Sequence, residues 1–144
     1  MAGIDAFGTQ FLRDSTGSGT FVSIANVTDI SGPSRSREAI EVTAHDSPDS
    51  YREFIKGLKD GGEVEITLNY DPGAATHAAL DADFEEDDLR SYQLLLLPGE
   101  ADEHTWEFSA LITDLEDAYP TEDKMERTAT FKISGKPVLT ATGA

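Results

Sequence analysis

The sequence predicts a mainly β fold: an antiparallel β-sandwich or barrel with one short α-helix, in a single domain spanning residues 1–144. In several segments apolar residues alternate with polar ones, which is the pattern of strands that bury one face. Clusters of Gly, Pro, Ser and Asp separate these segments. Only the alanine-rich stretch 74–84 has helical spacing, so about seven strands surround one helix.

The first half of the chain contains four predicted strands. Residues 8–12 and 20–27 form two strands joined by a Gly/Ser turn, and residues 38–44 alternate again. The clearest strand is 63–70, which has two chemically different faces. One face carries Val64, Ile66, Leu68 and Tyr70, and the other carries Glu63, Glu65, Thr67 and Asn69. The apolar face is expected in the core, and the polar face must contact water or a polar partner.

A helix is predicted after this strand. Asp71 suits the N-cap and Pro72 the first helical position. Leu80 and Phe84 lie one turn apart and would form a narrow apolar stripe against a sheet. The acidic run 85–88 opposes the carboxyl end of the helix dipole, so the helix should end there.

Three strands close the chain, over residues 92–97, 105–115 and 124–134, with a Pro-Gly hairpin loop at 98–103. The tail from Gly135 onward lacks a partner in this pattern and is expected to be loose. Residues 1–10 and 135–144 are therefore predicted to be assembly arms.

The segment 46–62 is long, polar and without clear periodicity. It carries Tyr51, Phe54, Ile55 and Leu58 among charged residues. Two interpretations are open: a loop that contacts another subunit, or a short helix packed on a sheet edge.

Composition excludes several classes of function. The net charge of −17, from 28 acidic and 11 basic residues, argues against a surface that grips nucleic-acid phosphates. It fits either a soluble acidic surface or one that repels a polyanion. The chain has no cysteine, and no apolar run is long enough to cross a membrane. The three histidines lie far apart and are expected in turns or on the surface, so no metal or cofactor site is predicted.

No catalytic constellation is visible. The acidic residues 81–87 resemble the start of a calcium loop, but Glu86 stands where the turn glycine belongs, which favours a solvated helix end. Trp106 and Phe108 could stack on a sugar, although their alternation with Ala110 and Ile112 favours core packing.

Two blocks of sequence resemble a known family. The first is YREFIKGLKDGGEVEITLNYDP with the following helix and LRSYQLLLLPGE; the second is TWEFSALITDLEDAYPTEDKMERTATFKISGKPVL. The order of the GLKDGGE turn, the LNYDP exit and the closing SGKP is similar to that of the major tail (tail tube) proteins of long-tailed phages, the lambda tail tube group. The resemblance spans about residues 32–139.

This resemblance implies a structural, non-enzymatic subunit without cofactor, which closes into six-membered rings stacked as a hollow tube for DNA passage. It implies tape-measure, tail-terminator and distal tail proteins as partners, assembly in the host cytoplasm, a final location in the virion tail, and no membrane contact. Two alternatives share part of the evidence: an inner tube subunit of a secretion system or contractile tail, and a monomeric carbohydrate-binding β-sandwich that uses Trp106.

Two sets of residues are predicted to act in such a tube. The polar sides of the strands are expected to line a hydrated, acidic lumen, with Lys132 as the exception; these residues are Glu41, Glu65, Thr67, Asn69, Glu107, Thr128, Thr130 and Lys132. The assembly contacts are expected in the long segment, the 98–104 hairpin tip and the termini; these residues are Tyr51, Arg52, Phe54, Ile55, Lys56, Lys59, Asp60, Glu100, Asp102 and Lys136.

Overall fold

The computed structural model describes residues 8–15 and 19–142, and in these residues the chain is mainly β with one α-helix. The strands are β1 (Gln10–Asp14), β2 (Phe21–Ser23), β3 (Val27–Ser31), β4 (Ser36–Glu41), β5 (Phe54–Asp60), β6 (Glu63–Asn69), β7 (Arg90–Leu96), β8 (His104–Ala118) and β9 (Glu126–Ala141). The helix is α1 (Ala75–Glu85), and a 3-10 turn, η1, covers Pro48–Ser50.

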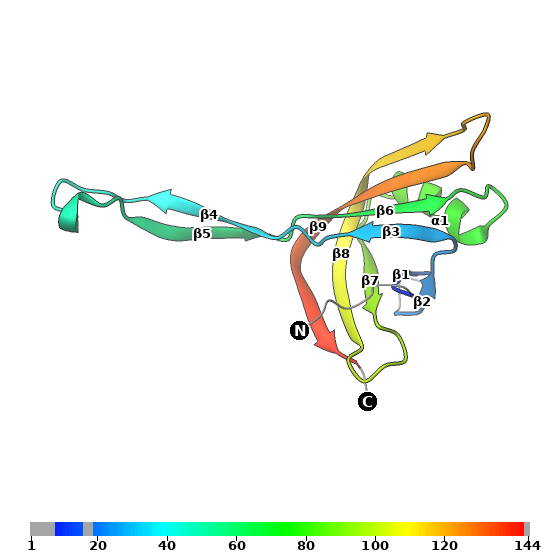
Figure 1. Ribbon diagram of the computed structural model, residues 1–144, viewed down its shortest axis with the longest axis horizontal. Coiled ribbons are helices and arrows are strands. Elements are labelled where there is room, and N and C mark those ends of the chain that lie inside the picture. The colour runs from blue at the N-terminus through cyan, green and yellow to red at the C-terminus, as the bar shows by residue number, and fades with distance from the viewer. Residues whose placement is uncertain (1–7, 16–18, 143–144) are drawn as a thin grey trace.

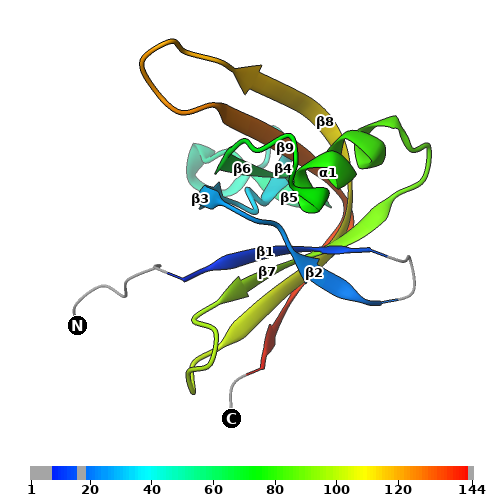
Figure 2. The same cartoon turned by 90° about the vertical axis from the view of Figure 1, so that its right-hand side faces the viewer.

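Seven strands form one antiparallel sheet in the order β2-β1-β7-β8-β9-β6-β3. The sheet curls because β8 and β9 are long and bent, with register shifts between Glu107 and Ser109 and between Ile112 and Asp114. The first half of β8 pairs with β7, whereas its second half, residues 111–118, pairs only with β9. The curl divides the sheet into two layers, one with β2, β1, β7 and the first half of β8, the other with β3, β6 and the second half of β8. The β8–β9 hairpin belongs to both layers (Figures 1 and 2), and the expected antiparallel β architecture is confirmed.

The core lies inside the curl, where alternate residues of the central strands meet. Val64, Ile66 and Leu68 of β6 are fully buried, as their alternation predicts. Phe11 stacks on Phe131 with ring centroids 4.9 Å apart, in a cluster that also includes Tyr92 and Phe108. Leu80 of α1 packs onto this cluster, so the helix covers one open side of the curl.

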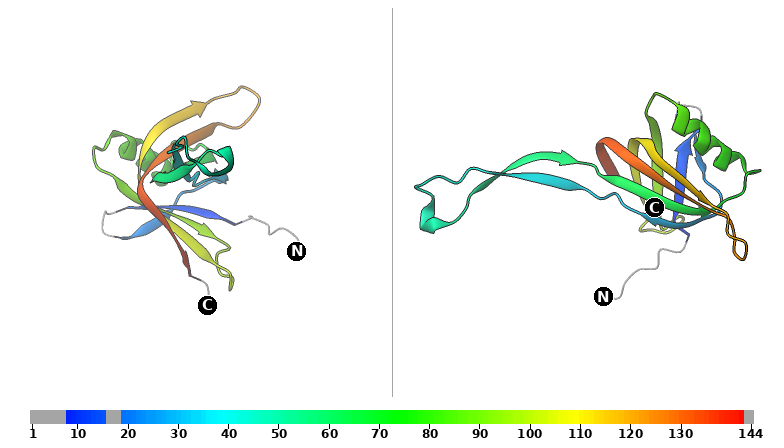
Figure 3. Two further views of the ribbon diagram at one scale, coloured as in Figure 1. Left: turned by 90° about the vertical axis from the view of Figure 1, so that its left-hand side faces the viewer. Right: turned by 90° about the horizontal axis from the view of Figure 1, so that it is seen from above.

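The long segment 46–62 is part loop and part strand: residues 46–53 form the tip of a hairpin, and β5 covers Phe54–Asp60. Strands β4 and β5 pair with each other in a two-stranded ribbon that projects far from the rest of the chain (Figures 1 and 3). We call residues 36–60 the extended hairpin, and the remaining described residues the body. The helical interpretation of this segment is wrong except for η1, because Phe54–Asp60 pairs with β4 instead of forming a helix.

Tight glycine packing fixes the root of the extended hairpin to the body. Gly62 has φ +79°, and a Cβ there would lie 1.9 Å from the Ser34 carbonyl oxygen. A Cβ on Gly61 would lie 2.7 Å from Ile133. The Ile133 N–H donates to the Gly62 carbonyl at 3.0 Å, which ties the root to β9. In the GLKDGGE turn, the backbone at Gly61 and Gly62 therefore packs against Ile133 and Ser34 more closely than a side chain would permit.

Three other expectations need correction. Residues 20–27 divide into β2 and the start of β3, with Asn26 at φ 62° between them. The tail after Gly135 is not loose, since β9 continues to Ala141 and pairs with the start of β8. The helix has Ala74 as its N-cap, because the Asp71 carboxylate accepts the Gly73 N–H at 3.0 Å in a separate turn. As for the predicted terminal arms, residues 1–7 and 143–144 lie outside the described residues.

The buried side of α1 also differs from the predicted stripe. His77, Leu80 and Asp83 are buried, whereas the Phe84 side chain is 45% exposed. Relative to the predicted orientation, the helix is turned about its axis so that Asp83 faces the sheet, where it pairs with Arg13 and Arg90. His77 is not a surface histidine: its Nδ1 accepts the Asp71 N–H at 3.0 Å, and its Nε2 lies 2.6 Å from the Ala25 carbonyl oxygen.

Candidate channel and assembly surfaces

The outward side of β3, β6, β9 and the second half of β8 is a continuous polar surface. The registers place Glu65 opposite Thr130, Thr67 opposite Thr128, and Asp29 opposite Thr67. We call this surface the polar face; its polar members are Asp29, Ser31, Glu63, Glu65, Thr67, Asn69, Asp114, Glu116, Glu126, Thr128, Thr130 and Lys132. It is acidic and hydroxyl-rich, and it lies on the side of the strands opposite the core.

The single basic residue of the polar face is paired. Lys132 Nζ lies 2.8 Å from Asp60 Oδ1, and Asp60 also accepts the Gly62 N–H at 2.8 Å. The hydrogen bonds from Lys132 and Gly62 hold the pKa of Asp60 below its usual value. Because this carboxylate stays ionised, the Lys132 charge is offset at the root of the extended hairpin.

The polar face contains six of the eight residues predicted to line a lumen. Glu65, Thr67 and Asn69 come from β6, and the other three from β9. Glu41 lies on β4 in the extended hairpin, and Glu107 lies on the first half of β8, beside Gln93 in the other layer. The structure does not bring these two residues to the polar face.

Sequence reasoning missed the acidic members contributed by β3 and β8. Asp114 and Glu116 face outward because the irregularity between Ile112 and Asp114 shifts the alternation by one residue. The spacing of three between Ile112 and Leu115 was a readable signal of this shift. Asp29 was missed because β3 was merged with the strand before it.

Both edges of the polar face lack a strand partner within the described residues. β3 is the last strand of the sheet, and residues 111–118 of β8 pair on one side only. Unpaired backbone N–H and C=O groups at such edges can pair with another chain. The polar face is therefore open at both edges in the single subunit.

The predicted assembly residues are exposed, and most lie on the extended hairpin. Exposed fractions are 74% for Tyr51, 54% for Phe54 and 52% for Ile55; Leu58, which was not among the predicted residues, is 88% exposed on the same hairpin. Glu100 and Asp102 lie in the turn between β7 and β8, and Lys136 lies on β9 near the hairpin root. The structure thus gives these residues no role in the core, while the contacts predicted for them stay a prediction.

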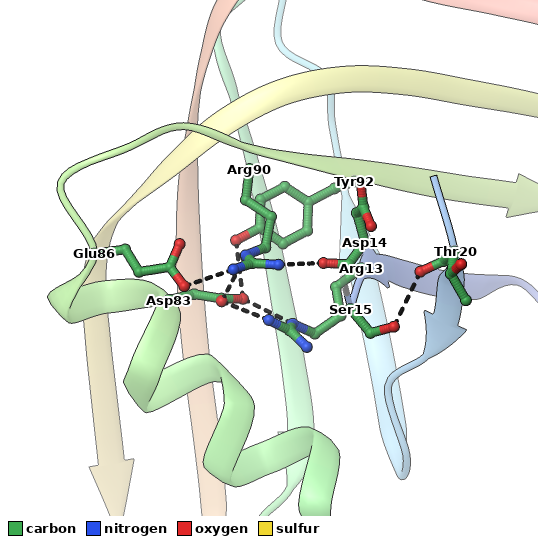
Figure 4. A network of polar contacts seen from close by, with 8 residues as sticks. All are labelled: Arg13, Asp14, Ser15, Thr20, Asp83, Glu86, Arg90 and Tyr92. Carbon is green, nitrogen blue, oxygen red and sulfur yellow. Dashed lines mark hydrogen bonds and ion pairs between the residues drawn. The ribbon is translucent and has the colours of Figure 1, made fainter. Parts of the chain in front are cut away.

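Buried ion pairs fix α1 to the sheet. Figure 4 shows Asp83 of α1 between two arginines: Arg13 Nη2 lies 2.6 Å from Asp83 Oδ1, and Arg90 Nε lies 2.8 Å from the same oxygen. Arg90 also pairs with Glu86 at 2.5 Å and donates to the Asp14 carbonyl. The Tyr92 hydroxyl donates to Asp83 at 3.3 Å, and burial raises the pKa of this phenol. Asp83, a central carboxylate of the calcium-like run 81–87, is therefore buried and engaged by arginines.

A second buried arginine connects α1 to the β8–β9 hairpin. Arg127 Nε donates to Asp117 at 2.7 Å, and Arg127 Nη1 donates to the His77 carbonyl at 3.0 Å. Its guanidinium lies 4.2 Å from the Tyr70 ring centroid. The hydrogen bond from Arg127 lowers the pKa of Asp117. This arginine holds the far half of the hairpin over the helix.

Trp106 is not an open sugar-stacking platform. Its ring is partly buried against the core, and the Arg35 guanidinium lies 4.9 Å from the ring centroid. In the described part of the chain, no group of three or more metal-ligating side chains is close enough to hold an ion. The helix there is also too short and too polar to cross a membrane.

Comparisons with known proteins agree with this architecture. Residues 5–140 match the family described as lambda phage tail tube protein. A solved structure of the tail of an empty gene transfer agent particle, with C6 symmetry, has a TM-score of 0.75 at 20% identity, covering 92% of this chain and 95% of that one. The SPP1 tail tube gives 0.70 at 13% identity, covering 94% of this chain and 78% of that one.

A tube from a contractile system has the same fold. The sheath-tube complex of an extracellular contractile injection system gives a TM-score of 0.71 at 13% identity, covering 97% of this chain and 93% of that one. No curated protein sequence matches the chain.

Proposed function

Because the chain belongs to the lambda phage tail tube protein family and is a structural component of the virion tail, we propose that six copies close into a ring and that rings stack into a tube. In this tube the polar face lines the lumen through which DNA passes. The C6 symmetry of the gene transfer agent tail, whose subunit has the same fold, supports the ring number.

The single observation that carries the proposal is the polar face with two open edges. A head-to-tail contact that closes by rotation makes a ring. In that ring β3 of one subunit pairs with residues 111–118 of β8 in the next, so that the four-stranded polar faces join into one continuous barrel. The apolar side of the strands stays inside each subunit, and the carboxylates surround the passage.

The negative charge of the polar face favours the passage of DNA along it rather than the binding of DNA. DNA phosphates are repelled by Asp29, Glu65 and Asp114 from neighbouring strands, while Lys132 is neutralised by Asp60. Since the Debye length is about 8 Å at physiological ionic strength, only wall charges next to the thin water layer act on the DNA. The acidic polar face therefore matters more than the total charge of the subunit.

The extended hairpin is proposed to contact the next ring. Its apolar side chains stay largely exposed in the single subunit and would be covered by a neighbouring copy. Tape-measure, terminator and distal tail proteins are the proposed partners at the lumen and the tube ends. Assembly is proposed in the host cytoplasm, without membrane contact or catalysis. The family match favours a long non-contractile tail over a contractile one.

Electron microscopy of the purified chain at rising concentration tests this function. We expect six-fold rings and tubes whose inner wall is the polar face. The matched variants are Glu65→Lys with Thr130→Lys on the polar face, and Glu107→Lys with Gln93→Lys on the other layer. In particles, the first pair should slow DNA ejection and the second should not. A monomer at every concentration, or a lumen walled by the layer of Glu107, would refute the proposal.

A further inference from the structure

The positive charges of this acidic chain are unevenly distributed. Arg13, Arg90, Lys124, Arg127 and Lys132 form ion pairs within the subunit. The other six of the 11 basic residues have no ion pair among the described residues, and all lie on the extended hairpin or at its root; they are Arg35, Arg37, Arg52, Lys56, Lys59 and Lys136. Basic residues without an ion pair, which we call the free cations, therefore cluster in one region of a molecule whose net charge is −17.

Four of these six line one groove. The groove lies between the root of the extended hairpin and the bend of β9, and its volume is about 1070 Å³. Arg35, Arg37, Lys59 and Lys136 contribute its charge, and Leu58, at 88% exposed, contributes an apolar wall. Of the two carboxylates beside it, Asp60 is already engaged by Lys132, which leaves Glu38. The groove suits a segment that carries carboxylates and a few apolar side chains.

The opposite end of the molecule carries such a segment. The turn that joins β8 to β9, residues 119–125, lies at the end of the body away from the extended hairpin (Figure 1). Glu122 and Asp123 are exposed in it, and so are Tyr119 at 63% and Met125 at 38%. Lys124 lies 3.9 Å from Asp123 and 3.7 Å from Glu126. Because Glu122 and Asp123 outnumber this one lysine, the turn is net acidic.

Because a basic groove and an acidic turn lie at opposite ends of the molecule, we propose that the groove at the hairpin root receives the β8–β9 turn of a second copy in the adjacent ring. The proposal rests on the proposed function, since rings stacked head to tail bring the hairpin end of one subunit to the opposite end of the next. Carboxylates of the turn pair with Arg37 and Lys136, and Tyr119 covers Leu58. The contact selects a head-to-tail order, because two groove ends repel each other.

Charge exchange tests the contact on the full chain. Arg37→Glu with Lys136→Glu reverses the groove, and Glu122→Lys with Asp123→Lys reverses the turn. Each pair should raise the protein concentration needed for tubes by about tenfold, because like charges are brought together. The four substitutions combined should restore most of the tube yield. Neutral variants, Arg37→Gln with Lys136→Gln, should give a smaller loss.

A matched control separates this contact from a general charge effect. Asp87→Lys with Asp88→Lys makes the same charge change in the exposed α1–β7 turn. Combined with the reversed groove, it should not restore tubes. Wild-type tube yield from the reversed groove, or restoration by the control, would overturn the groove contact while leaving the tube function intact. A wild-type chain that never forms tubes would overturn both.

Discussion

The body and the extended hairpin are both built from antiparallel strands, yet the body buries its apolar side chains and the extended hairpin leaves them exposed. In the body, Val64, Phe11 and Phe131 are fully buried between the layers. In the extended hairpin, no residue of β4 or β5 is buried, and Ile40, Phe54 and Ile55 are about half exposed or more, at 42%, 54% and 52%.

This difference separates what folds the subunit from what joins subunits. Burying a Leu or Phe side chain contributes roughly 1.5–3 kcal/mol, so the core strands stabilise the fold directly. The extended hairpin is held instead by ladder hydrogen bonds and polar side chains, such as Thr43, whose Oγ1 accepts the Glu53 N–H at 2.9 Å. Its apolar surface is available to another chain. The substitutions below test the contrast, in order of decreasing expected effect on subunit stability.

The largest effect is expected from Phe131→Ala in the body. Phe131 is fully buried and touches Phe11 and Tyr92, so its truncation leaves a cavity and should cost about 3–5 kcal/mol. Thermal unfolding followed by circular dichroism measures the decrease in the free energy of unfolding. A decrease below 1 kcal/mol would show that the body is not the stable unit described here.

Asp83→Asn should destabilise the subunit by about 3 kcal/mol, because it leaves Arg13 and Arg90 largely buried without their shared carboxylate. Denaturant titration gives the value. Glu86→Gln is the control: this side chain is 38% exposed, and its loss should cost less than about 1 kcal/mol. Equal effects of the two variants would contradict a buried clamp on α1.

Asp117→Asn should cost about 1 kcal/mol after solvent screening, and only where the carboxylate is ionised. The pKa of Asp117 is lowered from 3.8 by the hydrogen bond from Arg127, so its contribution is complete above pH 3.8 and is lost as pH falls through the lowered value. Melting temperatures of wild type and variant should differ at pH 6 and converge below the lowered pKa. A difference that is unchanged in acid would rule out this ion pair as the cause.

Phe54→Asp should change the free energy of unfolding by less than about 0.5 kcal/mol, since the side chain is 54% exposed. The same variant should no longer form tubes, which size exclusion and electron microscopy would show. An unfolded variant would place Phe54 in a core, and a tube-forming one would remove it from the assembly contact.

Sequence reasoning succeeded where one strand face is buried. In β6 the alternation of Val64, Ile66 and Leu68 with acidic and hydroxyl residues predicted both the core side and the polar face. It failed where burial does not alternate. The β4–β5 ribbon buries neither face; alternation predicted a strand over 38–44, which overlaps β4, but β5 carries no such periodic signal and was missed. The last residues of β9 pair with β8 through a bend at Gly135 that local composition does not reveal.

The sequence by itself determined the β class, the single helix, the acidic surface and six members of the polar face, because period-two alternation and net charge are properties of neighbours along the chain. Only the tertiary structure decided that β3 and the far half of β8 bound that face, and that Lys132 is paired with Asp60. The tertiary structure also brings four of the free cations together in one groove, at the end of the molecule away from the acidic turn. Such relations depend on strand order, register and bends, which long-range pairing sets and local sequence does not encode.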